Sequence, residues 1–263
     1  MRSIFKIIAA AAVASTAISS ASAASLAIFG QNNIGTLYDN SHTVTYVSDA
    51  QLATAGFLNS YDAFVYTRDG FSFGVGLSLA AAANVKSFVT GNIVLFNGDF
   101  QDDIGAVGTD NLFLNALTYV LGGAGKGYIG EYRGAFGAYS ANGDGNNPIG
   151  LVNGTSGVSG SGQGGSALEI SLTPAGVGNA ITAGTPFPYN PAAVEFGAAL
   201  SGENPAKVLA RFANGNAAII ASEVGQISAG VPEPTTWAMM LLGFGLMGAA
   251  LRRRQKVAVR YAF

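Results

Sequence analysis

The chain of 263 residues contains no cysteine, one histidine and few charged residues, which make up 11% of it. Without cysteine there is no disulfide framework, no thiolate nucleophile and no cysteine-ligated zinc or iron–sulfur centre. A Ser-His-Asp or Cys-His catalytic site would depend on His42 alone, which stands before a predicted strand with Asp39 nearby. We expect His42 to be an exposed turn residue. The sequence therefore indicates no cofactor, no histidine-based metal cluster and a fold held by packing.

The N-terminal segment 1–24 has the three parts of a secretory signal peptide. The parts are, in order, Arg2 and Lys6, an apolar run at 7–18, and the small tripeptide Ala21-Ser22-Ala23. Cleavage after Ala23 or Ala24 would start the mature chain near Ser25. We predict that the Sec translocon and signal peptidase act on this segment, and a buried N-terminal helix is the alternative.

The C-terminal segment 231–263 lacks the length of an ordinary membrane span. Its apolar run, 237–251, reaches about 23 Å as a helix, against a hydrocarbon core of about 30 Å. Basic residues follow the run, so the C-terminus is expected on the cytoplasmic side of the inner membrane and the main domain outside. The basic residues are Arg252, Arg253, Arg254, Lys256 and Arg260. We predict a hinge at 232–234, an apolar helix at 237–251 and a basic tail at 252–263.

This segment resembles the PEP-CTERM sorting signal of Gram-negative bacteria. The resemblance rests on Pro232, Glu233, Pro234, Trp237, Gly243-Phe244-Gly245, Arg252, Arg253 and Arg254. It implies that a membrane-embedded exosortase recognises the Pro-Glu-Pro element and processes the tail, and that the protein accompanies exopolysaccharide production. The expected location is the inner membrane at first, then the cell surface or extracellular matrix. A plain single-pass anchor is the alternative, and residues 255–263 have no assigned role.

Between these ends, the segment 25–230 is expected to form one extracytoplasmic domain. It holds six basic residues and fourteen acidic residues, so its net charge is about −8. Nucleic acid is excluded as a partner, because phosphate binding needs a basic patch. About 206 residues are enough for one sizeable core.

Short apolar runs alternate with helical patterns in the first half of this domain. Strands are predicted at 26–30, 43–47, 63–67 and 93–96, and helices at 50–57, 77–89 and 109–121. Asp49 and Thr109 are the expected N-caps of the first and third helices, and Gly122-Gly123 ends the third. This alternation predicts a three-layer α/β sandwich with a mostly parallel sheet.

The second half differs from the first. Residues 142–165 are rich in glycine, serine and asparagine and are predicted to be a loop, whereas 208–212 and 217–222 flank Asn214-Gly215 as a hairpin. An antiparallel C-terminal extension of the sheet is therefore expected. An all-β jelly roll is the competing architecture.

The segment GKGYIGEYRGAFGAYS at 125–140 resembles the strand–elbow–helix of class I glutamine amidotransferase-like domains. Those enzymes carry Gly-x-Cys-x-Gly at the elbow, and this chain has Gly130-Glu131-Tyr132-Arg133-Gly134. Tyr132 stands at the position of the nucleophile. The resemblance implies this fold over about 26–140 without the amidotransferase activity.

Other candidate motifs are incomplete. The glycine run at 122–127 follows a predicted helix and has Gly127 where a P-loop has Ser or Thr, so it is predicted to be a helix stop and turn. Two acidic clusters could bind calcium, but hydrogen-bonded turns are the preferred interpretation. These clusters are Asp99, Asp102 and Asp103, and then Asn142, Asp144 and Asn146.

Position in the fold gives a better site prediction than any motif. In an open parallel sheet, ligands bind outside the carboxyl ends of the strands. The polar residues expected there are Gln31, Asn32, Arg68, Asp69, Asn97, Asp99, Glu131 and Arg133. Such a mixed polar set suits hydroxyl-rich ligands such as sugars, and ordinary loop capping is the alternative.

Two functions follow from these observations. The first is a non-enzymatic surface protein that binds or builds the exopolysaccharide layer of a biofilm. The second is a surface hydrolase of glycans that uses Asp99 and Glu131 as its carboxylate pair, which requires a separation of either about 5 to 5.5 Å or about 6.5 to 9.5 Å across one cleft. The first is preferred because no nucleophile–base pair is evident.

Overall fold

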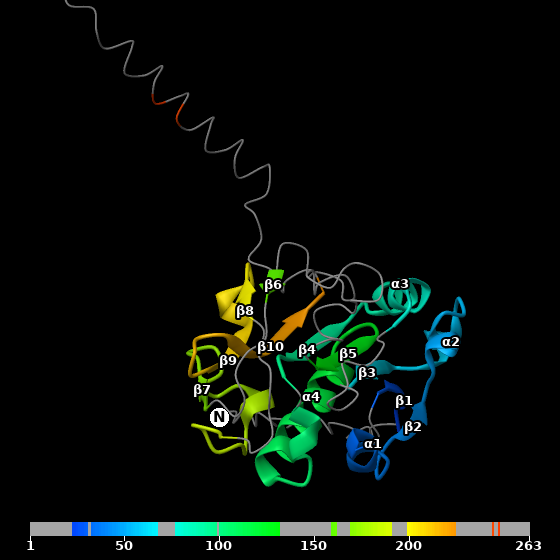
Figure 1. Cartoon of the computed structure of the whole chain (residues 1–263), viewed down its shortest axis with the longest axis horizontal. Helices are drawn as coiled ribbons and strands as arrows, with labels where there is room; N and C mark the ends of the chain where they lie inside the picture. Colours follow the sequence, from blue (N-terminus) through cyan, green and yellow to red (C-terminus); the bar gives the residue numbers. More distant parts are fainter. Residues whose placement is uncertain are drawn as a thin grey trace, which may run out of the picture.

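The computed structural model describes residues 23–30, 33–67, 77–98, 100–131, 159–161, 169–190 and 199–224, together with Phe244 and Met247. These residues form an α/β sandwich in which an eight-stranded sheet has helices on both faces (Figure 1). The predicted fold class, a mostly parallel sheet with an antiparallel C-terminal extension, is confirmed.

Five parallel strands come from the first half of the chain. They are β1 (Ser25–Phe29), β2 (Thr43–Tyr46), β3 (Ala63–Tyr66), β4 (Asn92–Phe96) and β5 (Gly127–Glu131). Their order in the sheet is β2-β1-β3-β5-β4. Every residue of β3 and β5 is buried, as expected for strands that helices cover on both faces. The four strands predicted from the sequence are all found, each within one residue of its predicted limits.

Three antiparallel strands extend the sheet beyond β4. They are β7 (Ile170–Leu172), β9 (Val208–Phe212) and β10 (Ala217–Glu223), and β10 pairs with β4. The predicted hairpin is confirmed: β9 and β10 are joined by a turn in which Gly215 has a φ of 89°. A second small sheet pairs β6 (Ser159–Ser161) with β8 (Ala199–Ser201). The prediction of a loop over all of 142–165 is therefore wrong at 159–161, where cross-strand pairing gives serine and glycine an extended conformation.

Helices of different lengths connect these strands. The α-helices are α1 (Asn33–Tyr38), α2 (Asp49–Leu52), α3 (Leu79–Phe88) and α4 (Val107–Gly122). The 3₁₀ helices are η1 (Phe57–Ser60), η2 (Phe100–Asp103), η4 (Ala180–Thr182) and η5 (Pro205–Lys207). The predicted helices at 77–89 and 109–121 correspond to α3 and α4, and Gly122 and Gly123 end α4 as expected.

Two helix caps differ from the prediction. Ser48, not Asp49, caps α2, because its side chain accepts the N–H of Gln51 in a capping box. That helix ends at Leu52, residues 53–56 form a turn in which Gly56 has a φ of 77°, and Phe57 begins η1. Thr109 is not the cap of α4 but lies buried inside its first turn, where its hydroxyl bonds the phenol of Tyr189.

Each face of the sheet carries its own pair of helices. The connections β1–β2 and β4–β5 run toward the β2 edge, whereas β2–β3 and β3–β4 run the opposite way. Because such crossovers are right-handed, their helices lie on opposite faces. One core accordingly contains Tyr38 of α1 and Phe113 of α4, and the other contains Leu52 of α2 and Val85 of α3.

The predicted signal segment and sorting tail fall almost entirely outside the described residues. Of the apolar run 237–251, the structure describes Phe244 and Met247, which are helical and exposed. Within the part of the chain that is described, no helix has the length and hydropathy needed to cross a membrane.

Candidate functional site

Buried polar side chains gather where the parallel strands end. Thr67 follows β3, Asn97 follows β4, and Glu131 is the last residue of β5. Gln101 lies in η2, directly beyond β4. All four residues have no exposed surface. This edge is where the fold predicts a ligand site, so the partners of these groups decide what the edge can do.

Glu131 is the central group of this cluster. β5 lies between β3 and β4, and Glu131 pairs in register with Phe96. One carboxylate oxygen, Oε1, accepts the backbone N–H of Gln101 at 2.6 Å. The amide Nε2 of Gln101 donates in turn to Oδ1 of Asp102, also at 2.6 Å. The carboxylate therefore fixes η2 over the end of the sheet.

The negative charge of Glu131 also affects the pKa of Tyr38, a tyrosine in the helix layer beside the sheet. Tyr38 is buried at the end of α1, and its hydroxyl donates to the carbonyl oxygen of Phe113 in α4 at 2.9 Å. Burial, and secondly the negative charge of Glu131, raise the pKa of the Tyr38 phenol well above its ordinary value. Tyr38 is thus a neutral hydrogen-bond donor that joins two helices.

Asn97 connects the parallel half of the sheet with the antiparallel half. Its backbone N–H donates to Ala218 at 2.8 Å, and its side-chain Nδ2 donates to the carbonyl of Ala217 at 2.6 Å. The amide side chain therefore continues the β4–β10 pairing beyond the last residue of β4. This hydrogen bonding gives Asn97 a structural role within the described residues.

The ends of β1 and β3 approach each other closely. The N–H of Thr67 donates to the carbonyl of Phe29 at 2.9 Å. Gly30 has a φ of 117°, and a Cβ there would stand 2.1 Å from the carbonyl oxygen of Thr67. Only glycine fits this position, because both the backbone angle and the lack of space exclude a side chain. The two strands lead to opposite faces of the sheet here, at a topological switch point.

The predicted crevice residues are only partly described. Asn97 and Glu131 come to the same edge, and both side chains are buried. Gln31, Asn32, Arg68, Asp69, Asp99 and Arg133 lie outside the described residues, so the predicted ligand role of the set stays a prediction. Tyr132, which stands at the nucleophile position of the predicted elbow, lies outside them as well.

Sequence reasoning missed two residues of the cluster, Thr67 and Gln101, and also the neighbouring Tyr38. Thr67 was expected only as the end of a strand, and Gln101 was overlooked between the acidic residues of the segment NGDFQDD. Tyr38 was missed with its helix, since α1 has only six residues and too little periodicity to be recognised. No sequence signal marks Gln101, because its bond to Glu131 uses the backbone N–H.

Other candidates from the sequence have structural partners. His42 is half-buried, and its Nδ1 accepts the N–H of Ala24 at 3.2 Å. The glycine run 122–127 ends α4 and leads into β5, as predicted. Among the described residues no three His, Asp or Glu side chains are grouped so that they could hold a metal ion. Asp99, Asn142, Asp144 and Asn146 lie outside those residues.

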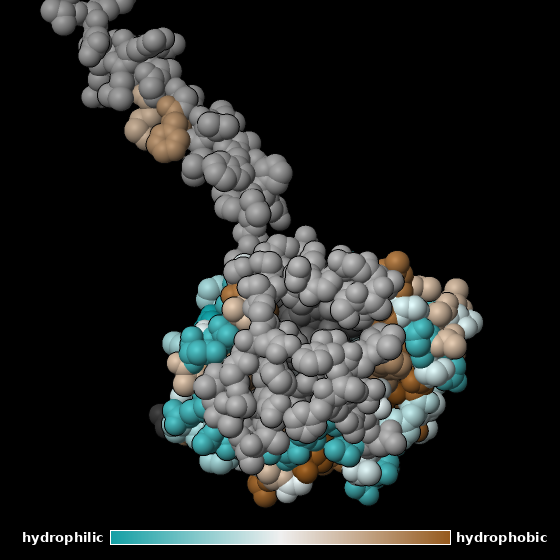
Figure 2. Space-filling model, viewed as in Figure 1, coloured by the Kyte–Doolittle hydropathy of each residue, from teal (hydrophilic) through white to brown (hydrophobic). Residues whose placement is uncertain are grey.

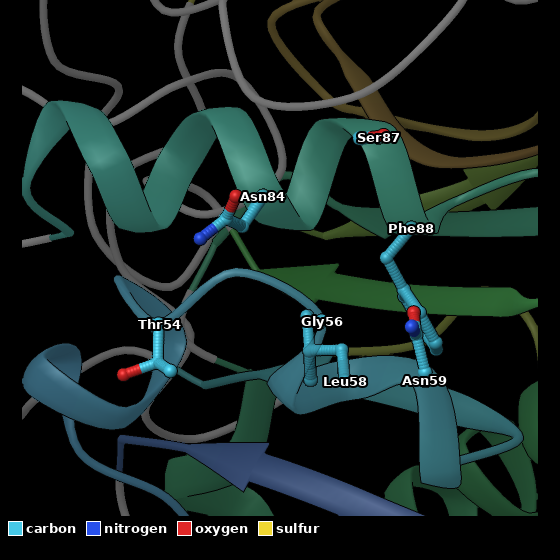
Figure 3. A pocket seen from close by; sticks show the side chains of 7 residues that line it. All are labelled: Thr54, Gly56, Leu58, Asn59, Asn84, Ser87 and Phe88. Atoms are coloured by element: carbon cyan, nitrogen blue, oxygen red, sulfur yellow. The ribbon is translucent and has the colours of Figure 1, made fainter.

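A small polar pocket lies between the α2–η1 segment and α3 (Figure 3). Figure 3 shows Asn84 and Phe88 extending from α3 toward that segment, with Asn59 beside Phe88. The residues around it are Thr54, Gly56, Leu58, Asn59, Asn84, Ser87 and Phe88, and they enclose about 100 Å³. Asn84 is engaged within the fold, since its Nδ2 donates to the carbonyl of Leu52 at 2.8 Å. The volume suits a few water molecules rather than a sugar ring.

A larger groove of about 480 Å³ lies between α1 and α4, and its lining includes Leu37, His42, Leu114 and Leu121. In the view of Figure 2, the hydrophobic side chains of the described residues lie in separate patches. Exposed Leu79 and Val107 belong to different helices on opposite faces of the sheet. The view shows no single large apolar face on the described part of the chain.

Comparison with known proteins identifies the C-terminal tail. Residues 230–254 match the PEP-CTERM protein-sorting motif. The match covers the Pro-Glu-Pro element and the three arginines, and it supports an exported surface protein that an exosortase sorts. No curated protein and no solved structure matches the chain. The resemblance to amidotransferase-like domains therefore gains no support from comparison.

Proposed function

We propose that this protein is a non-enzymatic binding or matrix component of a bacterial exopolysaccharide layer. In this proposal the segment 25–230 is the working domain, 1–24 directs export, and 231–263 is the exosortase substrate. The observation that carries the proposal is the sorting motif at 230–254. The acidic domain, with a net charge of about −8, disfavours anionic partners and leaves neutral, hydroxyl-rich chains as suitable ligands.

The described end of the sheet supports a binding role over a hydrolytic one. A glycosidase needs two carboxyl groups that reach the same bond of the substrate. Glu131 has no exposed surface, and its Oε1 is occupied by the N–H of Gln101. This geometry suits a carboxylate that holds the fold together. Asp99, the partner in the hydrolase alternative, lies outside the described residues.

The expected ligand surface is the set of polar residues that follow the parallel strands. Gln31, Arg68, Asp69, Asp99 and Arg133 carry amide and charged groups that can bond sugar hydroxyls. The supporting argument is the topological switch point between β1 and β3, where ligands of open α/β sheets bind. An amidotransferase-like ancestry, with Tyr132 in place of the nucleophile, is part of the same proposal and is supported only by the sequence around β5.

The test is a deletion strain scored for cell aggregation and for exopolysaccharide attached to cells. We expect both to fall on deletion and to return with the full-length gene. Complementation with an Arg68→Ala, Arg133→Ala double variant should restore export but not attachment. The matched control is an Asn59→Ala, Ser87→Ala double variant in the small polar pocket, which should restore both.

Three results would count against the proposal. Unchanged attachment in the deletion strain removes the link to exopolysaccharide. Release of ammonia from glutamine by the purified protein would show an amidotransferase activity. Cleavage of the glycan by the wild type, lost in a folded Glu131→Gln variant, would favour the hydrolase.

A further inference from the structure

The residues on both sides of the first predicted cleavage site of the signal peptide, Ala23 and Ala24, differ in their contacts. Ala23 is exposed, whereas Ala24 is partly buried and packs against the core of the α1–α4 face. The sequence alone leaves cleavage after Ala23 and after Ala24 equally open. The contacts made by Ala24 distinguish the two.

Ala24 is held by hydrogen bonds at both its backbone groups. Its N–H donates to Nδ1 of His42 at 3.2 Å, and its carbonyl accepts the N–H of Thr43 at 2.8 Å. The second bond extends the parallel pairing of β1 and β2 by one step at the end where β1 begins. Among the described residues, Ala24 is therefore the first that is hydrogen-bonded to the sheet.

The next residue is fixed by the neighbouring strand on the other side. The N–H of Ser25 donates to Oδ2 of Asp62 at 2.9 Å, and the N–H of Asp62 donates to the carbonyl of Ser25 at 2.8 Å. Asp62 also forms an ion pair with Lys126 at 3.5 Å. The beginning of β1 is thus held between His42 and Asp62.

We propose that signal peptidase hydrolyses the Ala23–Ala24 bond and that His42 holds the amino group which this reaction exposes. Water adds to the carbonyl carbon of Ala23 and the carbon–nitrogen bond breaks. Ala23 leaves with a carboxylate, and the nitrogen of Ala24 takes up a proton to become an ammonium group. One N–H of that ammonium keeps the existing bond to Nδ1 of His42. This inference rests on the export step of the proposed function and moves the boundary between the export segment and the working domain by one residue, so that the mature domain begins at Ala24.

Cleavage after Ala24 instead would remove contacts that this residue makes with the fold. It would remove the bond to His42, the acceptor of the Thr43 N–H and the packing of Ala24. In return it would place the ammonium of Ser25 beside Asp62, whose side chain is half exposed and already pairs with Lys126. An exposed ion pair adds little stability, so a folded domain that begins at Ala24 keeps more stabilising contacts than one that begins at Ser25.

The proposal also gives the single histidine a role. His42 faces the N-terminus of the mature domain and lines the groove between α1 and α4. Its Nδ1 acts as an acceptor, which places the ring proton on Nε2. His42 is a positioning residue that holds the processed N-terminus. Its hydrogen-bond partner is the backbone nitrogen of Ala24 and not a member of a catalytic triad.

The first test is the N-terminal sequence and intact mass of the exported full-length gene product from its host. A mature protein that begins at Ala24 is expected. A mature protein that begins at Ser25 overturns this inference but is still consistent with export. An uncleaved protein that stays in the cell overturns both this inference and the export step of the proposed function.

The second test measures how fast an amine-selective acylating reagent modifies the α-amino group of the mature protein, with Lys86 as the internal reference. His42→Phe removes the acceptor and keeps a ring, and the rate should rise about two- to tenfold, as the loss of one hydrogen bond predicts. His42→Asn keeps an acceptor oxygen near the position of Nδ1, and the rate should stay near that of the wild type. Equal acylation rates in the wild type, His42→Phe and His42→Asn would overturn the role of His42. If His42→Phe is not exported, His42→Ala replaces it. Slower acylation of the wild type than of His42→Ala then supports the role, and equal rates overturn it.

Discussion

The buried carboxylate of Glu131 accepts the backbone N–H of Gln101 at 2.6 Å, and this bond ties the end of the central strand β5 to η2. A charged acceptor makes a short and strong hydrogen bond in a site without solvent. A buried charge left without its donor is costly, so the carboxylate and the loop that bears Gln101 constrain each other. Glu131 therefore supports the candidate site as a buried, hydrogen-bonded carboxylate and not as a solvent-exposed one.

Two replacements of Glu131 should destabilise the protein to different degrees. Glu131→Gln keeps an acceptor but loses its charge, and we expect a loss of about 1 to 2 kcal/mol in the free energy of unfolding. Glu131→Ala also leaves a cavity and an unsatisfied N–H, and should cost about 2 to 5 kcal/mol. Urea denaturation of the exported protein measures both. A Glu131→Ala protein as stable as the wild type would contradict the structural role of this bond.

Tyr38 should make the protein sensitive to alkali. Its folded-state pKa is raised by burial and then by Glu131, so its contribution to stability is complete below the unfolded pKa of about 10 and is lost as the pH rises through the folded pKa. Tyr38→Phe should cost about 1 kcal/mol at neutral pH, because the carbonyl of Phe113 loses its donor. Above about pH 10 this difference should shrink.

Denaturation curves at pH 7 and at alkaline pH test this prediction. Tyr46, Tyr119 and Tyr189 also have raised pKa values, so the variant should keep part of the alkaline slope. A Tyr38→Phe protein whose stability falls with pH as steeply as that of the wild type would show that Tyr38 ionises freely in the folded state.

The sequence predicted the central strands of the parallel half well because they are largely buried. β3 and residues 93–96 of β4 are continuous apolar runs, and such runs between helical patterns have few other interpretations. The same logic failed where local hydrogen bonds decide. Ser48 and Gln51 set the start of α2, and neither the capping box nor the break at Gly56 is visible in the hydrophobic pattern.

The candidate site was predictable in position but not in detail. The rule that ligands bind at the carboxyl ends of parallel strands located Asn97 and Glu131 at one edge. It could not show that both are buried, since burial depends on η2 folding over β5. The role of Gln101 depends on its backbone N–H, which carries no signature of residue type.

Gly30 should tolerate no side chain. Its φ of 117° is unfavourable for other residues, and a Cβ would stand 2.1 Å from the backbone oxygen of Thr67, which cannot move without disturbing β3. We expect Gly30→Ala to cost about 3 kcal/mol or more. Gly122→Ala is the matched control, because Gly122 lies at the end of α4 with open space around it and no left-handed backbone. This control should be neutral or stabilise by up to about 1 kcal/mol, and thermal unfolding of the two variants compares them directly.

Processing of the tail should depend on the Pro-Glu-Pro element within the matched motif at 230–254. The apolar run that follows reaches only about 23 Å as a helix, so it can hold the chain briefly but is poorly suited to permanent anchoring. If an exosortase reads the element, the Pro232→Ala, Pro234→Ala double variant should keep residues 237–263 and stay in the membrane fraction. The matched control is Pro205→Ala at the start of η5, which should be processed normally.

Intact mass and membrane fractionation distinguish the outcomes of this experiment. A wild-type protein that retains the tail would establish a plain anchor. A double variant processed like the wild type would show that the prolines are not the recognised element.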